Sequence, residues 1–279
     1  MTPRTLRSHL YLPADNERFL AKAPDSGADA VILDLEDAVA PDRKAAALAG
    51  ALRYLEDAAP GPERWVRVNG GDRGLAEIEA VASAHPDGVW LPKAEPGEWI
   101  GTAVAALGAA GIRPGILIES AAGLVGLPNL PPLPGDALTQ LGEVDMAADL
   151  RMRDRSEEAM VPFRARIVLE TAIRRLPQPV APVDDRLGDA AAFRAGSVLL
   201  RDRGFGSRAC IHPSQVPIVN EVFGIDPDEL ERARRVLEQH AERSGDGLGA
   251  YRDEDGRMAD LATIRWARDL VGRAEGEQG

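Results

Sequence analysis

The stretch that decides the fold is Gly115-Ile116-Leu117-Ile118-Glu119, a short apolar run that ends in a carboxylate. Short apolar runs between polar residues are typical of buried strands. A second run, Ala137-Leu138-Thr139-Gln140-Leu141, leads into Asp145. Both runs therefore aim an acid at the end of a strand, where α/β proteins usually build an active site.

Strand-like runs of this kind recur along the chain and alternate with longer segments in which apolar residues follow helical spacing. The runs cover residues 8–12, 30–34, 65–68, 88–91, 115–118, 137–141, 179–182 and 208–211. Such alternation is typical of parallel strands joined by crossover helices. The eight units predict a (β/α)8 TIM barrel. A doubly wound open sheet remains an alternative, although no glycine-rich dinucleotide fingerprint follows the first strand.

The pattern changes after Phe223-Gly224-Ile225-Asp226-Pro227. A charged amphipathic helix is predicted over 228–243, a glycine-rich stretch follows at 244–249, and a last helix is predicted over about 260–275. We therefore expect residues 1–224 to form the barrel domain and residues 225–279 to form a small C-terminal helical appendage.

Composition excludes several classes of protein. The 279 residues carry a formal net charge of −12, which disfavours general binding to nucleic acid or to anionic membranes. An anionic substrate would therefore need a locally basic pocket. The single cysteine, Cys210, excludes an internal disulfide and is expected to be a buried structural thiol. The sequence shows no signal-peptide core and no apolar run of membrane-spanning length, so a cytoplasmic location is expected.

Acidic residues at the strand ends form the candidate metal site. Mg²⁺ prefers oxygen ligands and keeps several waters, so Glu119 and Asp145 are sufficient protein ligands for it. Helix capping or a surface ion pair would explain the same two residues. Asp34, Glu36 and Asp37 follow the second predicted strand, where they either accept hydrogen bonds from metal-bound water or cap the next helix.

Arg67 is the candidate anion-binding residue. It lies inside Trp65-Val66-Arg67-Val68-Asn69, where an inward guanidinium is costly to bury without an anion. Its planar fork suits the carboxylate of a substrate. The alternative is a structural ion pair between Arg67 and either Glu36 or Asp34.

Other reactive residue types give weaker signals. His212 is followed by a proline and by Ser-x-Gln, which favours the start of a helix over the site of a general base. His9, His85 and His240 lack partners at metal-binding spacing, so no zinc site is predicted. Ser120 lacks the flanking glycines of a hydrolase nucleophile.

Several motifs occur in an order and spacing that resemble one enzyme family. The most specific is Gly27-Ala28-Asp29-Ala30-Val31-Ile32-Leu33-Asp34-Leu35-Glu36-Asp37-Ala38-Val39-Ala40-Pro41 with Lys44. The others are Arg7-Ser8-His9-Leu10-Tyr11-Leu12-Pro13, Val66-Arg67-Val68-Asn69, Leu91-Pro92-Lys93, Leu117-Ile118-Glu119, Leu141-Gly142 through Asp145, and Ile211-His212-Pro213-Ser214-Gln215. On these motifs the chain resembles, over almost its whole length, the citrate lyase β-subunit-like family of CoA-ester lyases, which includes malyl-CoA and citramalyl-CoA lyases.

The resemblance implies a TIM barrel in which Glu119 and Asp145 bind Mg²⁺ and in which Arg67 and Glu119 contact a 2-oxo acid. It also implies that Asp260, in Gly256-Arg257-Met258-Ala259-Asp260, is the acid or base at the acetyl-CoA carbon. From the residues alone, Asp260 is an ordinary helix N-cap. The resemblance further implies a homotrimer or homohexamer, in which the C-terminal part closes the site of a neighbouring subunit.

The implied reaction is the reversible cleavage of a 3-hydroxyacyl-CoA, such as malyl-, citramalyl- or citryl-CoA, into an acyl-CoA and a 2-oxo acid. CoA phosphates need cations, and the candidates near the first two strand ends are Arg18, Lys22, Arg43 and Lys44. Three alternatives remain: a thioesterase acting on the same substrates, a class II aldolase acting on free hydroxy-oxo-acids, and an inactive subunit of a citrate lyase complex.

Overall fold

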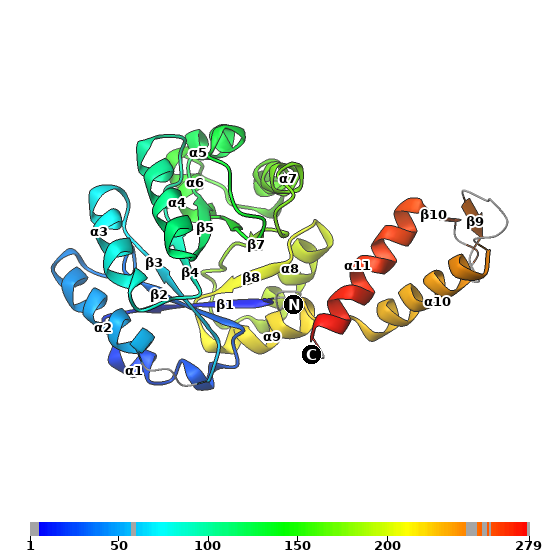
Figure 1. Ribbon diagram of the computed structural model, residues 1–279, viewed down its shortest axis with the longest axis horizontal. Coiled ribbons are helices and arrows are strands. Elements are labelled where there is room, and N and C mark those ends of the chain that lie inside the picture. Colours follow the sequence, from blue (N-terminus) through cyan, green and yellow to red (C-terminus); the bar gives the residue numbers. More distant parts are fainter. Residues whose placement is uncertain (1–5, 57–59, 244–249, 253–255, 257, 278–279) are drawn as a thin grey trace. The chain divides into compact units, whose positions relative to one another are not determined.

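Parallel strands close into a barrel in the computed structural model, which describes residues 6–56, 60–243, 250–252, 256 and 258–277 (Figure 1). The strands are β1 (Ser8–Pro13), β2 (Ala30–Asp34), β3 (Glu63–Arg67), β4 (Gly88–Leu91), β5 (Arg113–Ile118), β6 (Leu138–Leu141), β7 (Val180–Ala181) and β8 (Ser207–Cys210). Each strand pairs in parallel with the next, and β1 also pairs with β8. This last pairing closes the sheet, so the predicted TIM barrel is confirmed and the open-sheet alternative is wrong.

Helices surround the barrel and connect successive strands (Figure 1). The longer ones are α2 (Lys44–Glu56), α3 (Gly71–Ala82), α4 (Glu98–Ala110), α7 (Glu157–Ile173) and α8 (Ala190–Asp202). The shorter ones are α1 (Glu17–Leu20), α5 (Ala121–Gly126), α6 (Glu143–Asp149), α9 (Val216–Val222) and the 3-10 turns η1 (Pro24–Ser26), η2 (Pro41–Arg43), η3 (Leu127–Asn129) and η4 (Pro213–Gln215). In the described part of the chain, no helix has the length and apolar character needed to cross a membrane.

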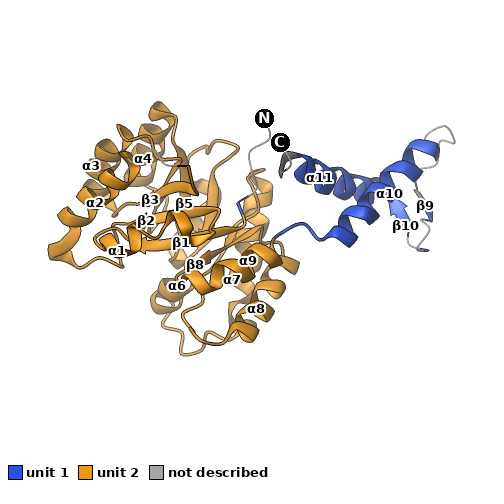
Figure 2. Ribbon diagram, turned by 90° about the horizontal axis from the view of Figure 1, so that it is seen from below, with its two compact units in different colours: residues 1–6, 224–279 blue, residues 7–223 orange. Residues whose placement is uncertain are grey.

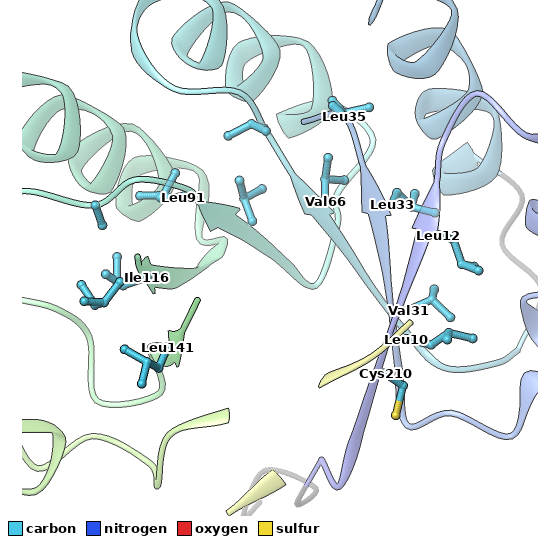
Figure 3. Packing of buried hydrophobic residues seen from close by; sticks show 14 of the residues in the cluster. Leu10, Leu12, Val31, Leu33, Leu35, Val66, Leu91, Ile116, Leu141 and Cys210 are labelled. Carbon is cyan, nitrogen blue, oxygen red and sulfur yellow. The ribbon is translucent and has the colours of Figure 1, made fainter. Parts of the chain in front are cut away.

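Alternate residues of each strand point outward and pack beneath the helices. Leu10 and Leu12 of β1 belong to the same buried cluster as Val31 and Leu33 of β2 (Figure 3). Cys210 of β8 is fully buried in this cluster, as expected for a structural thiol, and burial raises its pKa to about 12. This apolar layer attaches the helices to the barrel, so it also positions the loops that follow the strands.

The intervening residues fill the barrel interior with large rings. Trp65 of β3 and Trp90 of β4 are fully buried, and their ring centroids lie 5.7 Å apart. Adjacent strands make room with glycine, since a Cβ at Gly88 would lie 2.2 Å from the Trp65 ring and one at Gly115 would lie 2.4 Å from Trp90. Trp65 precedes Arg67 by two positions on β3, and Trp90 is the register partner of Arg67 on β4, so the two indoles fill the interior beneath and beside the guanidinium.

The chain divides into two compact units (Figure 2). Residues 7–223 hold the barrel, and the segment from Gly224 onward belongs to the other unit. The elements of this second unit are α10 (Pro227–Arg243), β9 (Ala250–Arg252), the antiparallel β10 (Met258–Asp260) and α11 (Leu261–Glu277). Its small core consists of Ala233, Val236, Ala267 and Leu270. The helices predicted for this region are therefore present, and the glycine-rich stretch 244–249 lies outside the described residues.

We expect Gly115→Ala to destabilise the barrel, because the added methyl group would meet the Trp90 ring at 2.4 Å inside a closed sheet. Overpacking of this kind typically lowers the free energy of unfolding by about 1–3 kcal/mol. Urea denaturation followed by circular dichroism measures the change.

Gly101→Ala is the matched control. Gly101 lies within α4, and a Cβ there would meet nothing within 4 Å. Alanine in a helix interior is expected to raise the free energy of unfolding by about 0.5–1 kcal/mol. Equal effects of the two substitutions would contradict the packing argument.

Candidate active site

Arg67 ends β3 and lies in a clamp of carboxylates. Its Nε and Nη2 atoms donate to Asp34 Oδ1 and Oδ2 at 2.7 and 2.6 Å, and its Nη1 atom lies 3.2 Å from Glu36 Oε2. The guanidinium carbon lies 5.0 Å from the centroid of the Tyr11 ring. The side chain is 12% exposed. Both structural ion pairs that we considered as an alternative are therefore present.

The clamp still leaves Arg67 able to bind a ligand. A guanidinium has five N–H donors, and within the described part of the chain Asp34 accepts hydrogen bonds from two of them, while Glu36 forms an ion pair with Nη1. Asp34 uses the Nε and Nη2 side of the fork, so a substrate carboxylate can bind only at the Nη1 and Nη2 side. Burial alone would lower the pKa of Arg67, but its hydrogen bonds to Asp34 raise it, and the side chain stays charged.

Asp34 also holds the loop after β2. Its carboxylate accepts the N–H groups of Glu36 and Ala38 at 2.9 and 3.1 Å. α2 begins only at Lys44, so the helix-capping role that we considered for the acids after β2 is not observed. Asp34 instead joins this loop to Arg67, and a change in either one is expected to move the other.

Glu36 is nearly fully buried, and both of its oxygens have protein partners. Oε2 contacts Arg67, and Oε1 lies 2.6 Å from Lys93 Nζ. Each carboxylate oxygen can accept a second hydrogen bond, so contact with metal-bound water stays a prediction for Glu36. Asp37 Oδ1 lies 3.6 Å from Lys93 Nζ, and Asp37 lines the cavity described below, so a water-mediated contact with a metal stays a prediction for Asp37.

Glu119 follows β5 and has one buried oxygen without a partner. The Lys93 N–H donates to Oε1 at 2.5 Å, whereas Oε2 is buried and has no hydrogen-bond partner among the described residues. Burial raises the pKa of Glu119 to about 8; the Lys93 hydrogen bond opposes this shift, and the Glu36 and Asp145 carboxylates add to it. A buried carboxylate with an orphaned oxygen is suited to receive a cation.

Asp145 brings a second carboxylate to the same cavity. It lies in the first turn of α6 and is partly buried. Gly142, just before α6, allows the two loops to approach, because a Cβ there would lie 2.7 Å from Glu119 Cβ. The cavity measures about 230 Å³. Its lining includes Tyr11, Asp34, Asp37, Arg67, Leu117, Glu119, Gln140, Asp145, Val183 and Ile211.

The donor set suits magnesium. In the part of the chain that the structure describes, no group of three or more His, Cys, Asp or Glu side chains could hold a metal. Mg²⁺ keeps several waters and is commonly bound through only one or two carboxylates. Glu119, with its unpartnered oxygen, and Asp145 can therefore hold Mg²⁺ together with water and substrate oxygens.

Sequence reasoning missed three residues around this cavity: Lys93, Tyr11 and Gln140. The Tyr11 hydroxyl donates to Gln140 Oε1 at 2.9 Å across the barrel interior, and both residues line the cavity. Burial raises the pKa of Tyr11, so the phenol stays neutral. Strand alternation was the available signal for Tyr11 and Gln140, since both occupy inward positions. Lys93 stands in the motif Leu91-Pro92-Lys93, which carries part of the family resemblance, but the motif gave it no role because its partners are distant in the chain.

Two of the cations predicted for CoA phosphates have other partners. Lys44 Nζ donates to the carbonyl oxygens of Leu35 and Glu36 at 2.8 and 2.7 Å. Arg43 Nε lies 3.2 Å from Asp15 Oδ2. Lys44 therefore supports the loop after β2, and contact with CoA stays a prediction for both cations.

A second cavity, of about 480 Å³, lies beside β1 and η4. Its lining includes Leu12, Pro13, Phe19, Lys22, Ile211 and His212. Arg18 is exposed on α1, which also carries Phe19. The structure thus gives Lys22 a place in a largely apolar cavity, while Arg18 lies on the adjoining surface.

His212 and Asp260 both cap helical segments. His212 Nδ1 accepts the Ser214 N–H at 3.2 Å at the start of η4, which confirms the helix-start interpretation.

Asp260 Oδ1 accepts the N–H groups of Thr263 and Ala262, both at 2.9 Å, and these hydrogen bonds lower its pKa. Arg257 of the same motif lies outside the described residues. A catalytic role for Asp260 stays a prediction.

Comparisons with known proteins agree with this geometry. A family model described as HpcH/HpaI aldolase/citrate lyase matches residues 7–213, and a model described as C-C bond lyase of the TIM-barrel fold matches residues 192–276. A (3S)-malyl-CoA thioesterase from Cereibacter sphaeroides is 35% identical, with 96% of this chain and 94% of that protein covered. Human mitochondrial citramalyl-CoA lyase is 28% identical, with 95% and 84% covered.

One solved structure shares nearly the whole architecture. CitE from Mycobacterium tuberculosis, in complex with magnesium, acetoacetate and coenzyme A, superposes with a TM-score of 0.77 at 28% identity, covering 97% of this chain and 98% of that one. The chain is thus an enzyme of the TIM-barrel carbon–carbon lyase class. It belongs to the HpcH/HpaI aldolase/citrate lyase family.

We expect Mg²⁺ binding to release about one proton near neutral pH, because a carboxyl with a pKa of about 8 must ionise before it can bind a cation. Below that pKa, the Mg²⁺ affinity should rise by roughly tenfold per pH unit. Calorimetric titration in two buffers with different ionisation enthalpies counts the released protons.

The same pKa predicts the pH dependence of the metal-free fold. Glu119 has a raised pKa in the folded state, so the folded protein binds more protons, and its stability should fall as pH rises from about 4.5 to about 8. Glu119→Gln is the control. It should lose both the pH dependence of Mg²⁺ affinity and the pH dependence of stability described above. Proton release by that variant equal to that of the wild type would contradict the assignment.

Proposed function

We propose that this protein is a Mg²⁺-dependent CoA-ester lyase that cleaves a 3-hydroxyacyl-CoA into an acyl-CoA and a 2-oxo acid, or joins the two. The proposal rests mainly on one cavity that holds the unpartnered oxygen of Glu119 beside Asp145 and Arg67. A divalent cation and an arginine together suit a substrate whose carboxylate adjoins another oxygen. In the related CitE complex, magnesium and coenzyme A belong to the proposed ligand classes, whereas acetoacetate is a 3-oxo acid.

The residues around the cavity have separable roles in cleavage. When bound, Mg²⁺ supplies Lewis-acid charge to the oxygen that becomes the keto group. In cleavage the Asp260 carboxylate takes the proton of the 3-hydroxyl, the bond between C2 and C3 breaks, and its electron pair passes to the thioester α-carbon, which then takes that proton back from Asp260. Arg67 binds the carboxylate of the 2-oxo acid through its Nη1 and Nη2 side. Asp34 keeps the guanidinium in place before substrate arrives, which limits reorganisation during the reaction.

The size of the cavity assigns the two parts of the substrate to different places. A volume of about 230 Å³ suits the oxo-acid part, and its walls include Leu117, Val183 and Ile211, which are apolar. The CoA part must then extend outside it. We place the CoA tail in the 480 Å³ cavity, where Phe19 offers an apolar surface and Lys22 offers a cation.

The proton at the α-carbon is assigned to Asp260. As a carboxylate, Asp260 takes this proton in the condensation direction and returns it in cleavage. Its lowered pKa keeps it ionised at rest. In this proposal the C-terminal extension, residues 225–279, closes the site of a neighbouring subunit in a homotrimer or homohexamer.

A thioesterase acting on the same substrates is the second candidate. The 35% identity to a (3S)-malyl-CoA thioesterase favours it. Such an enzyme would use the same metal site but would release free CoA and a hydroxy acid. Mass spectrometry of the products of malyl-CoA or citramalyl-CoA distinguishes the two reactions, since a lyase yields acetyl-CoA and a 2-oxo acid.

Removing either charge that faces the substrate should abolish most turnover. We expect Arg67→Ala and Glu119→Ala to lower kcat about 10²–10³-fold, because the first deletes a preorganised donor to developing charge and the second deletes a carboxylate ligand of Mg²⁺. Arg67→Lys keeps the charge but not the paired hydrogen bonds, so its activity should fall between those of Arg67→Ala and the wild type. Release of acetyl-CoA from malyl-CoA measures each rate.

Arg194→Ala is the control for these substitutions. Arg194 forms an exposed ion pair with Glu221 on the outside of the barrel. Its removal should leave turnover unchanged. Circular dichroism confirms that each variant folds, and full activity in folded Arg67→Ala would refute the assignment.

Asp260→Asn should remove lyase and condensation activity while Mg²⁺ and pyruvate still bind. Asparagine keeps an oxygen that can cap α11, so folding should be preserved. Exchange of the acetyl-CoA methyl protons with deuterated water, followed by NMR, reports the proton step directly. Wild-type exchange rates in this variant would exclude Asp260 as the base.

A further inference from the structure

Lysine is rare in this chain and is concentrated at one end of the barrel. Lysine and arginine together number 33, but only Lys22, Lys44 and Lys93 are lysines. All three lie in segments that follow strands β1, β2 and β4. An ammonium group is a compact charge with three donors, which can reach places that a planar guanidinium cannot.

Two of these lysines converge on Glu36. Lys44 Nζ donates to the Glu36 carbonyl oxygen at 2.7 Å, and Lys93 Nζ donates to Glu36 Oε1 at 2.6 Å. The other carboxylate oxygen, Oε2, accepts the Asp37 N–H at 3.2 Å and contacts Arg67 Nη1 at the same distance. Glu36 is 4% exposed, so its orientation depends on these contacts.

Lys93 contacts two carboxylates of the site, Glu119 and Glu36. Its backbone has a φ of 50°, in the left-handed region that a residue with a side chain rarely adopts. In this conformation its N–H points to Glu119 Oε1 at 2.5 Å, while the N–H of the next residue, Ala94, continues the barrel by donating to Leu117 O at 3.1 Å. The backbone N–H of Lys93 therefore binds the Glu119 carboxylate, and its side chain binds the Glu36 carboxylate, which also contacts Arg67.

We propose that Lys93 is a positioning residue that keeps Glu36 away from the substrate-binding side of Arg67. Its ammonium occupies Glu36 Oε1, so Glu36 contacts Arg67 through one oxygen and leaves the Nη1 and Nη2 side of the guanidinium open. Without the ammonium, Oε1 is free to turn toward the remaining N–H groups of Arg67. Glu36 would then bind the fork with both oxygens and compete with the substrate carboxylate.

The inference rests on the proposed function, because Arg67 must receive the carboxylate of a 2-oxo acid. It predicts separate effects on oxo-acid affinity and on Mg²⁺ affinity, whereas a general loss of structure would lower both. The side chain of Lys93 governs oxo-acid affinity, whereas its N–H governs the orientation of Glu119. Substitutions of the side chain should therefore leave Mg²⁺ affinity unchanged.

Lys93→Met tests this directly, since methionine keeps the length of the side chain and the backbone N–H but removes the charge. We expect the KM for pyruvate or glyoxylate, measured with acetyl-CoA and Mg²⁺, to rise about tenfold or more, which is the loss expected for one charge-assisted hydrogen-bonding partner. The Mg²⁺ affinity, measured by calorimetry without substrate, should match that of the wild type. Lys93→Arg should recover part of the oxo-acid affinity.

Arg151→Met is the matched control, because Arg151 is an exposed cation with a similar φ of 55°. It should change neither affinity. Calorimetric titration of the Mg²⁺-loaded protein with pyruvate and with glyoxylate gives a readout that does not require turnover. Equal oxo-acid affinity in Lys93→Met and the wild type, or a parallel loss of Mg²⁺ affinity, would overturn the role of Lys93. Failure of the wild type to bind either oxo acid would instead overturn the proposed function, and this inference with it.

Discussion

Charge balance at the carboxyl end of the barrel is the constraint on which the rest of the site depends. The carboxylates there are Asp34, Glu36, Asp37, Glu119 and Asp145. Burying carboxylates is costly unless cations or hydrogen bonds compensate them. Arg67 and Lys93 contact Asp34, Glu36 and Asp37 at the end of β2 and so compensate their charges. Glu119 and Asp145 remain as the pair of carboxylates best suited to bind a cation. The same network holds the loop after β2, while Glu119 Oε2 stays buried without a hydrogen-bond partner among the described residues.

The barrel interior decides where this network can form. Trp65 and Trp90 fill the barrel interior next to Arg67, and Gly88 and Gly115 on the adjacent strands admit the two rings. Side chains inside a closed barrel cannot reach solvent at the filled end. His9 packs edge-on against Trp90 there, and burial lowers its pKa to about 4, so the ring stays neutral. Arg67 follows Trp65 by two positions on β3, and alternation points both side chains inward. Interior packing and the buried ion pairs of Arg67 thus use successive inward positions of the same strand.

Much of the architecture could be predicted from the chain alone. The apolar runs located the strands to within about two residues, and the acids that follow them identified Glu119 and Asp145 as residues sharing one cavity. The partners of Arg67 were harder, because the sequence could not tell a substrate carboxylate from Asp34 as the occupant of its fork. Lys44 shows the same difficulty, since a cation at the start of a helix fits a phosphate ligand as well as it fits the two backbone carbonyls that it contacts.

Sequence by itself determined the positions of the strands and helices and the types of side chain at the strand ends, because these follow from local periodicity. Only the tertiary structure decided which oxygens and nitrogens meet. Lys93 joins Glu36 and Glu119 from distant parts of the chain, and Tyr11 meets Gln140 across the barrel. Such contacts depend on closure of the sheet and on its register, which place side chains to within a hydrogen-bond length, and no local pattern carries that information.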